Sequence, residues 1–244
     1  MREIAQVLEE ATDAIRKRNP RKVVAFTGAG VSAESGIPTF RGAGGLWRNY
    51  RPEELATPEA FARDPATVWE WYEWRRDLIR NAQPNAAHRA IASLPNALVV
   101  TQNIDGLHAR AGSPDIIELH GNIFRVRCAH DPVARDAFDR FEALPPLCDR
   151  GELLRPDVVW FGEMLPEDAL ARAAAAIREA DLLLVIGTSG VVYPAAGLVA
   201  LHRGLSIEIN PEASALSSAC TMVVPATAAV AVPPLIEALM EGRA

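Results

Sequence analysis

Glycines follow the first apolar, β-branched run of the chain at a spacing that suits phosphate binding. Residues 23–27 are Val-Val-Ala-Phe-Thr, and Gly28, Gly30 and Ala33 follow them in the pattern G-x-G-x-x-[G/A]. The first glycine permits a tight turn, the second leaves room for phosphate oxygens, and the alanine lets the next segment pack closely. Backbone N–H groups at the start of that segment can then bind negative charge. Taken alone, such a turn is as compatible with a purely structural role.

A second group of polar side chains follows a later strand-like run. Residues 97–101 are apolar and β-branched, and Gln102, Asn103 and Asp105 come directly after them. Ligand groups gather at the carboxyl ends of strands in open α/β sheets. We therefore expect these side chains to face the same cleft as the glycine turn. The alternative is local, because Asn-x-Asp-Gly also forms Asx-type turns.

Alternating strand and helix patterns must position these groups. The patterns predict strands at residues 23–27, 97–101, 116–119, 182–186, 205–209 and 221–224, and helices at 4–17, 57–63, 67–80, 86–93, 167–180, 194–202 and 233–240. This alternation is typical of an α/β fold with a mostly parallel sheet and helices on both faces. Residues 122–154 carry mixed charge and prolines without a clear period, which indicates a small inserted module.

Composition narrows the classes of function. Hydrophobic residues make up 49% of the 244 residues, which supports a sizeable core, and the formal net charge is −6. This net negative charge argues against a protein that binds nucleic acids or anionic membranes in general. No apolar run is long enough to span a bilayer, and the N-terminal stretch is not a secretory signal. Three cysteines suit a reducing compartment, so we expect a cytoplasmic protein without a membrane or specific nucleic-acid partner.

Six motifs in order resemble the sirtuin family of NAD-dependent protein-lysine deacylases. They are GAGVSAESGIPTFRG at 28–42, TQNIDGLH at 101–108, His120-Gly121, LRPDVVWFGE at 154–163, GTS at 187–189 and NPE at 210–212. The resemblance spans nearly the whole chain. It implies a Rossmann-like NAD-binding domain made of residues 1–42, 85–121 and 155–244. It also implies a small domain formed by two insertions, residues 43–84 and 122–154.

The resemblance implies NAD as cosubstrate and acylated lysine in proteins or peptides as partner, with nicotinamide and O-acyl-ADP-ribose as products. It makes His120 the general base, since imidazole titrates near neutral pH, whereas a lone histidine before a glycine is otherwise a turn residue. Asn103 and Asp105 complete the implied catalytic set. The cofactor contacts that it implies are Gly28, Ala29, Gly30, Ala33, Phe40, Arg41, Trp47, Gln102, Asn103, Ile104, Asp105, Gly187, Thr188, Ser189, Asn210, Glu212 and Ala228.

Tyr72 and Arg75 match the Y-x-x-R pair of the sirtuin subgroup that removes succinyl and malonyl groups. Residues three apart on a helix share a face, a guanidinium binds a carboxylate through two hydrogen bonds, and a phenol adds another. Ala43 would leave room for a long acyl chain. The competing interpretation makes the Trp/Tyr face core and Arg75 a solvated charge. The walls of the peptide groove that the resemblance implies are Val159, Phe161, Gly190 and Val191.

The cysteines depart from the family pattern. Most sirtuins bind a structural zinc through two C-x-x-C pairs, but here Asp131 and Gly151 stand where the second and fourth cysteines belong. Cys128 and Cys148 remain, and although His130 and Asp131 are allowed ligand types, their spacing is poor. We therefore predict no metal. The module must then be held by packing, for which the candidates are Val126, Val133, Phe138, Phe141 and Leu144.

Other functions stay open at this point. The chain could be predominantly a deacetylase, or an NAD-dependent mono-ADP-ribosyltransferase that uses the same cofactor site with another acceptor. A non-catalytic NAD-binding protein is a third possibility. Tyr72 and Arg75 favour a desuccinylase and demalonylase that also removes acetyl groups. The presence of His120, Asn103 and Asp105 together argues against a non-catalytic protein.

Overall fold

The molecule is organised around a parallel sheet of six strands, as the alternating pattern predicts. The computed structural model describes residues 4–39, 52–128 and 131–242. The strand order is β3-β2-β1-β7-β8-β9, and all neighbouring pairs are parallel. The chain order reverses between β1 and β7, which is the place where open α/β sheets bind ligands. The strands are β1 (Val23–Thr27), β2 (Ala97–Thr101), β3 (Asp115–Glu118), β7 (Leu182–Ile186), β8 (Leu205–Ile209) and β9 (Met222–Val224).

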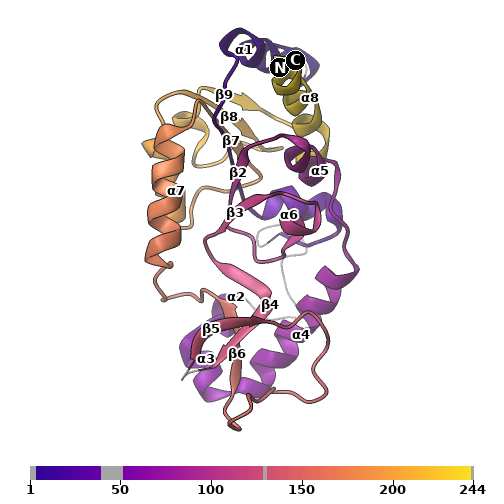
Figure 1. Ribbon diagram of the computed structural model, residues 1–244, viewed down its shortest axis with the longest axis vertical. Coiled ribbons are helices and arrows are strands. Elements are labelled where there is room, and N and C mark those ends of the chain that lie inside the picture. Colours follow the sequence, from indigo (N-terminus) through magenta and orange to yellow (C-terminus); the bar gives the residue numbers. More distant parts are fainter. Residues whose placement is uncertain (1–3, 40–51, 129–130, 243–244) are drawn as a thin grey trace.

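Helices cover both faces of this sheet (Figure 1). α1, α5 and α8 pack on one face in a cluster that includes Ile15, Ile91 and Leu235. α7 and the 3-10 helix η2 pack on the other through Ile177 and Leu198. β1, β7 and β8 are therefore buried along their whole length, which explains the apolar runs at residues 23–26 and 182–186. The helices of this layer are α1 (Ile4–Arg18), η1 (Ala29–Ser35), α5 (Ala86–Ser93), α6 (Leu107–Arg110), α7 (Glu167–Glu179), η2 (Ala195–Leu201), η3 (Ser217–Ala219) and α8 (Ala228–Glu241).

A second, smaller sheet lies at the lower end of the molecule in Figure 1. It is antiparallel in the order β5-β4-β6, and it contains β4 (Gly121–Cys128), β5 (Asp131–Asp136) and β6 (Leu154–Val158). Beside it lie α2 (Pro52–Leu55), α3 (Pro58–Arg63) and α4 (Pro65–Asn81). This small unit thus combines two stretches of chain that are far apart in sequence. The domain boundary expected at 154/155 falls inside β6.

The small unit has an apolar core of its own around α4. Trp69 is fully buried, its indole N–H donates to the carbonyl of Leu154 at 2.7 Å, and its ring meets Phe141 edge to face. Val126 is buried, and Phe141 and Leu144 are packed against the same cluster. The expected packing of Val133 is wrong, because this side chain is 67% exposed, whereas Phe138 is 47% exposed and its ring lies 4.6 Å from that of Phe124. Val133 belongs to β5, an edge strand that pairs only with β4.

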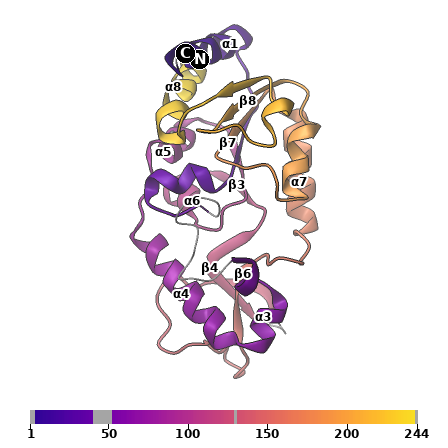
Figure 2. The same ribbon diagram turned by 180° about the vertical axis from the view of Figure 1, so that it is seen from behind.

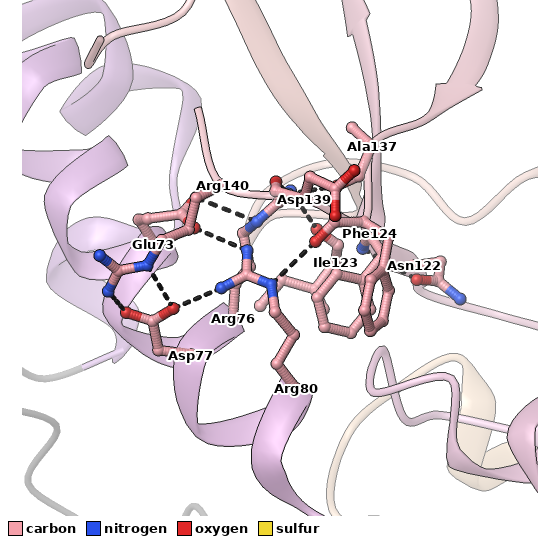
Figure 3. A network of polar contacts seen from close by, with 11 residues as sticks. Glu73, Arg76, Asp77, Arg80, Asn122, Ile123, Phe124, Ala137, Asp139 and Arg140 are labelled. Carbon is pink, nitrogen blue, oxygen red and sulfur yellow. Dashed lines mark hydrogen bonds and ion pairs between the residues drawn. The ribbon is translucent and has the colours of Figure 1, made fainter. Parts of the chain in front are cut away.

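Arg76 of α4 ties this helix to the small sheet (Figure 3). Its side chain is fully buried, and its guanidinium donates to three main-chain carbonyls. The acceptors are Ile123 at 3.1 Å, Asp139 at 2.8 Å, and Ala137. The same guanidinium forms an ion pair with Glu73, at 3.0 Å between Nε and Oε2. Burial lowers the pKa of Arg76 to about 10, so the side chain stays charged. These contacts supply partners for β4 and for the loop that follows β5.

Arg80, one turn further along α4, extends the network. It pairs with Glu73 at 2.7 Å and with Asp77, and its Nε donates to the carbonyl of Phe138 at 2.8 Å. Arg140 reaches back from the loop to Asp77 (Figure 3). Charged side chains of α4 therefore help to hold the small unit together, beside the apolar side chains that the sequence pattern indicates.

The far end of the large unit is closed by α1 and α8, which lie side by side away from the small sheet (Figure 2). Arg16 and Glu241 join them through an ion pair of 2.9 Å. No helix within the described ranges is both long and apolar enough to cross a bilayer.

Candidate active site

A cavity of about 990 Å³ lies at the carboxyl ends of the central strands. The residue directly after each of four strands lines it: Gly28 after β1, Gln102 after β2, Gly187 after β7 and Asn210 after β8. Side chains of α4 and of the segment after β6 line it as well, so it lies between the large sheet and the small unit. Its volume suits a small-molecule site.

Most of the predicted site residues meet in this cavity. Those that line it are Gly28, Ala29, Gly30, Ala33, Tyr72, Arg75, Gln102, Asn103, Ile104, Asp105, His120, Val159, Phe161, Gly187, Thr188, Ser189, Asn210, Glu212 and Ala228. Gly190 and Val191 are not among its lining residues, which include the neighbouring Val192 and Tyr193 instead. Phe40, Arg41, Ala43 and Trp47 lie outside the described residues.

The glycine turn packs directly on the turn after β7. The N–H of Gly28 donates to the carbonyl of Ile186 at 2.9 Å, and the N–H of Gly30 donates to that of Gly187 at 2.8 Å. A Cβ on Gly30 would come within 2.7 Å of the Gly187 Cα. Backbone packing therefore requires glycine here, in addition to the space for phosphate that the sequence pattern indicates.

His120 lies between β3 and β4, with its ring directed at the end of β2. Its Nδ1 is 2.7 Å from the carbonyl oxygen of Gln102. A carbonyl only accepts hydrogen bonds, so Nδ1 carries the proton and Nε2 has a free lone pair. Burial lowers the pKa of His120, and the bond to Gln102 acts in the opposite direction. The imidazole is therefore neutral at physiological pH and able to accept a proton.

Asp105 is buried and hydrogen-bonded on both carboxylate oxygens. Oδ2 accepts from the Ser32 hydroxyl at 2.7 Å, and Oδ1 accepts from the N–H of Leu107 at 2.9 Å. The second bond is the Asx turn that the sequence left as an alternative, so the turn and the cavity position coexist. Burial raises the pKa of Asp105, while both hydrogen bonds oppose that shift. Asn103 joins the cluster by donating to Ser32 at 3.2 Å.

Two histidines behind Asp105 were not foreseen from the sequence. His88 of α5 is 3.4 Å from Ser32, and its ring centroid is 4.7 Å from that of His108. His108 in turn contacts Thr27 at 3.1 Å. Burial lowers the pKa of His88 to about 4 and that of His108 to about 3, so both are neutral. His108 lies on α6, soon after β2, whereas His88 reaches this place through the packing of α5, and no local pattern records their contact.

The later strand ends are joined to β2 through Thr188. The amide of Gln102 donates to its hydroxyl at 3.0 Å, and the amide of Asn210 donates to its carbonyl at 3.1 Å. The residues expected to contact the two halves of a dinucleotide are thus held by one another across the ends of β2, β7 and β8, with β1 lying between the first two.

Tyr72 and Arg75 face this cavity from α4. Their side chains are among the most buried polar groups of the chain, with 1% and 4% of the residue surface exposed. The Arg75 guanidinium carbon lies 4.8 Å from the ring centroid of Trp71 and 5.6 Å from that of Tyr72. Burial lowers the pKa of Arg75. The interpretation of Arg75 as a solvated charge is therefore wrong.

Comparisons with known proteins decide the family. The Sir2 family profile matches residues 28–194. The chain belongs to the Sir2 family of NAD-dependent deacylases. A relative from Aquifex aeolicus, named NAD-dependent protein deacylase, is 54% identical over 209 residues, which is 82% of this chain and 87% of that protein.

Solved sirtuin structures agree with this fold. A Sir2 homologue in complex with NAD has a TM-score of 0.88 and 46% identity, over 97% of this chain and 95% of that one. A Sir2 protein with deacetylated p53 peptide and 3′-O-acetyl ADP-ribose has a TM-score of 0.82 and 33% identity, over 94% and 97%. NAD is thus the cosubstrate of this sirtuin.

The donor set of this sirtuin does not match a four-cysteine zinc site. In the described part of the chain, three potential ligands lie within 4.8 Å of one another: the sulfurs of Cys128 and Cys148 and a carboxylate oxygen of Glu152. A structural zinc takes four ligands. Asp131, one of the two ligands considered from the sequence, is instead paired with Arg135 at 2.9 Å, and the other, His130, lies outside the described residues. The absence of zinc remains a prediction.

Proposed function

We propose that this sirtuin removes succinyl and malonyl groups from protein lysines, and acetyl groups as well. NAD-dependent deacylation is the activity of its family, and the acyl preference is the new element. One observation carries it: the buried Tyr72 and Arg75, three residues apart on α4, line the same cavity as His120. An acyl-lysine whose carbonyl lies near His120 would extend its free carboxylate toward this pair.

The chemistry of the pair favours an acidic acyl group. A carboxylate only accepts hydrogen bonds, and both a guanidinium and a phenol can donate to it. Arg75 is desolvated, and attraction between opposite charges is stronger away from water. An acetyl group ends in a methyl and gains none of these bonds. The expected preference therefore comes from added contacts with the longer acyl group, with the lysine and NAD sites shared by all substrates.

The chain's own residues suggest how the reaction is assisted. Bound NAD supplies the ribose carbon that receives the acyl oxygen and the nicotinamide that leaves. His120 can take a proton from a ribose hydroxyl at Nε2, because Nδ1 is committed to Gln102. Asn103 and Asp105 offer an amide and a carboxylate to the nicotinamide half, and Ser32 holds both of them in place.

The segment after β6 supports peptide binding. Val159 and Phe161 line the cavity, and Phe161 is partly exposed at its rim. The N–H of Val159 is bonded to the carbonyl of His120 at 2.9 Å, so this segment is fixed beside the base. An extended acyl-lysine peptide could add alongside it through main-chain hydrogen bonds. The proposed partners are therefore acylated proteins, selected weakly by the sequence around the lysine.

A mainly deacetylating enzyme is the second candidate. It is favoured by the acetyl ADP-ribose and deacetylated peptide that accompany the sirtuin structure described above. The two candidates differ in what Arg75 contributes, since a deacetylase does not need a buried cation at the end of the acyl chain.

The deciding experiment compares succinyl-, malonyl- and acetyl-lysine peptides on the wild type and on Arg75→Met. We expect kcat/KM for the acidic acyl peptides to fall by about tenfold or more, as loss of charged hydrogen bonds implies, with acetyl activity retained. Arg172→Met, which removes an exposed arginine of α7, is the matched control. Equal losses on all three peptides would refute the acyl preference. Label from NAD that stays on the protein would indicate ADP-ribosyl transfer instead.

A further inference from the structure

The Tyr72 hydroxyl is held from behind by an indole. The Nε1–H of Trp160 lies 2.9 Å from the Tyr72 oxygen, and both residues are buried, with Trp160 only 2% exposed. The indole N–H can donate but cannot accept. The direction of this hydrogen bond is therefore fixed: Trp160 donates and the Tyr72 oxygen accepts.

This direction decides how Tyr72 can act. A phenol has one hydrogen, which lies near the plane of the ring on one side or the other. When the indole N–H occupies one side, the Tyr72 hydrogen must take the other. Within the described part of the chain, Trp160 is the single hydrogen-bond partner of this hydroxyl. Tyr72 is thus set to donate its hydrogen, and it lines the cavity where a ligand can accept it.

Trp160 is itself held rigidly. Its backbone N–H donates to Glu163 Oε2 at 2.8 Å. Glu163 is bound by Arg155 through two hydrogen bonds of 2.6 and 2.9 Å. The Arg155 guanidinium carbon lies 3.5 Å from the centroid of the Trp160 ring, and the Phe61 ring is 5.1 Å from it. Cation–π and aromatic contacts of this kind restrict the ring to one orientation.

The neighbours of Trp160 connect it to the substrate. Trp160 lines the cavity together with Val159 and Phe161, which flank it in the chain, and its indole N–H is directed at the Tyr72 hydroxyl. One short segment therefore serves the proposed peptide groove on one side and the back of the acyl pocket on the other.

We propose that Trp160 is a positioning residue that commits the Tyr72 hydroxyl to donate, and so sets the preference for acyl groups that end in a carboxylate. Arg75 can donate from the same helix, so both of these described residues, Tyr72 and Arg75, offer donors to the cavity. A carboxylate, which only accepts, satisfies both groups, whereas a terminal amide would also direct hydrogens at them. This inference rests on the proposed function and adds a selectivity determinant that acts through the Tyr72 hydroxyl.

The test replaces Trp160 with phenylalanine, which keeps an aromatic ring and removes the N–H. We expect KM for a succinyl-lysine peptide to rise by about threefold or more, as for loss of one hydrogen bond, with kcat retained and acetyl-lysine kinetics unchanged. The discrimination between succinyl and succinamyl peptides, which differ only in carboxylate and amide, should fall by a similar factor. In a Tyr72→Phe background, Trp160→Phe should add nothing to either ratio.

Trp69→Phe is the matched control. It lies on the same helix as Tyr72, is fully buried, and loses an indole N–H that donates to the Leu154 carbonyl. A general loss of stability would appear in both variants, whereas acyl discrimination should change only in Trp160→Phe. Equal effects of Trp160→Phe on succinyl and acetyl peptides, or a full effect in the Tyr72→Phe background, would refute the inference.

The two proposals fail in different ways. A wild type without any preference for succinyl over acetyl peptides contradicts the proposed function. A preference that Tyr72→Phe abolishes and Trp160→Phe leaves intact contradicts only the role of Trp160.

Discussion

Nδ1 of His120 lies 2.7 Å from the main-chain carbonyl oxygen of Gln102. The two residues come from different strand ends, so the imidazole is oriented by the edge of the large sheet and not by its own neighbours. A backbone carbonyl cannot change its role as acceptor, and the base is therefore available at Nε2 in every neutral molecule.

The pH dependence of turnover should report this base. Burial lowers the pKa of His120 below the ordinary value of 6.5, and only the neutral form can accept a proton. We expect kcat/KM to rise with pH along an acidic limb whose midpoint lies below pH 6.5, and then to level off. His120→Ala should reduce turnover by about a hundredfold or more. His202→Gln, at a histidine bonded to Ile177 and Leu205, should leave the profile unchanged, and a midpoint above 6.5 would contradict the burial argument.

The contact between the two glycine turns predicts a sharp effect of one methyl group. In Gly30→Ala the new Cβ would lie 2.7 Å from the Gly187 Cα and 2.9 Å from its carbonyl oxygen, so both turns must move apart. We expect a loss of about 1–3 kcal/mol in the free energy of unfolding and a higher KM for NAD. Gly197→Ala meets nothing closer than 3.7 Å and should behave as wild type in denaturant titration. Similar behaviour of the two variants would contradict the packing argument.

Arg76 should matter more for stability than its charge suggests. Arg76→Met would leave the Ile123, Ala137 and Asp139 carbonyls and the Glu73 carboxylate without their buried partner. Breaking a buried pair from one side costs about 3–5 kcal/mol, and urea titration should show a loss of this order. Arg140→Met removes an exposed arginine of the same network and should cost about 1 kcal/mol or less. A comparable loss in both variants would contradict this prediction, because it would mean that the exposed ion pair stabilises the protein as much as the buried contacts do.

The purified protein should contain no stoichiometric zinc. Three donor atoms, from Cys128, Cys148 and Glu152, come together in the described residues, and a structural site takes four. Metal analysis should therefore find far less than one zinc per chain, and a chelator should leave the thermal unfolding midpoint unchanged. One bound zinc per chain that disappears in Cys148→Ser would overturn this prediction.

The large sheet could be predicted because its strands are covered on both faces. Residues 23–26 and 182–186 are apolar without interruption, and the structure buries all of them. The glycine turn and the polar residues after β2 could be placed at strand ends for the same reason. His88 and Ser32 could not, because their contact depends on how α5 meets the sheet.

The small unit shows where local patterns carry too little information. Val133 was expected to help pack the unit and is exposed. Arg75 and Arg76 belong to residue types that are usually solvated, and both are buried. Arg76 donates to main-chain carbonyls, including that of Asp139. Because every residue has such a carbonyl, the sequence does not indicate which ones Arg76 will bind. The pairing of β4 with β6 could not be predicted either, because the segment between them has no periodic pattern and the pairing is made by main-chain groups.

The small unit is built from two separate stretches of chain, so its helices and its strands are synthesised at different times. α4 leaves the ribosome well before β4, β5 and β6, so a nascent chain that ends before residue 121 presents Trp69 and Arg76 with none of their later partners. The full set of partners is present only after the chain has passed Leu154, when the strands β1 and β2 of the large sheet have already been made. During that interval the apolar surface around Trp69 is exposed, so the nascent chain is then most prone to aggregation and most accessible to chaperones.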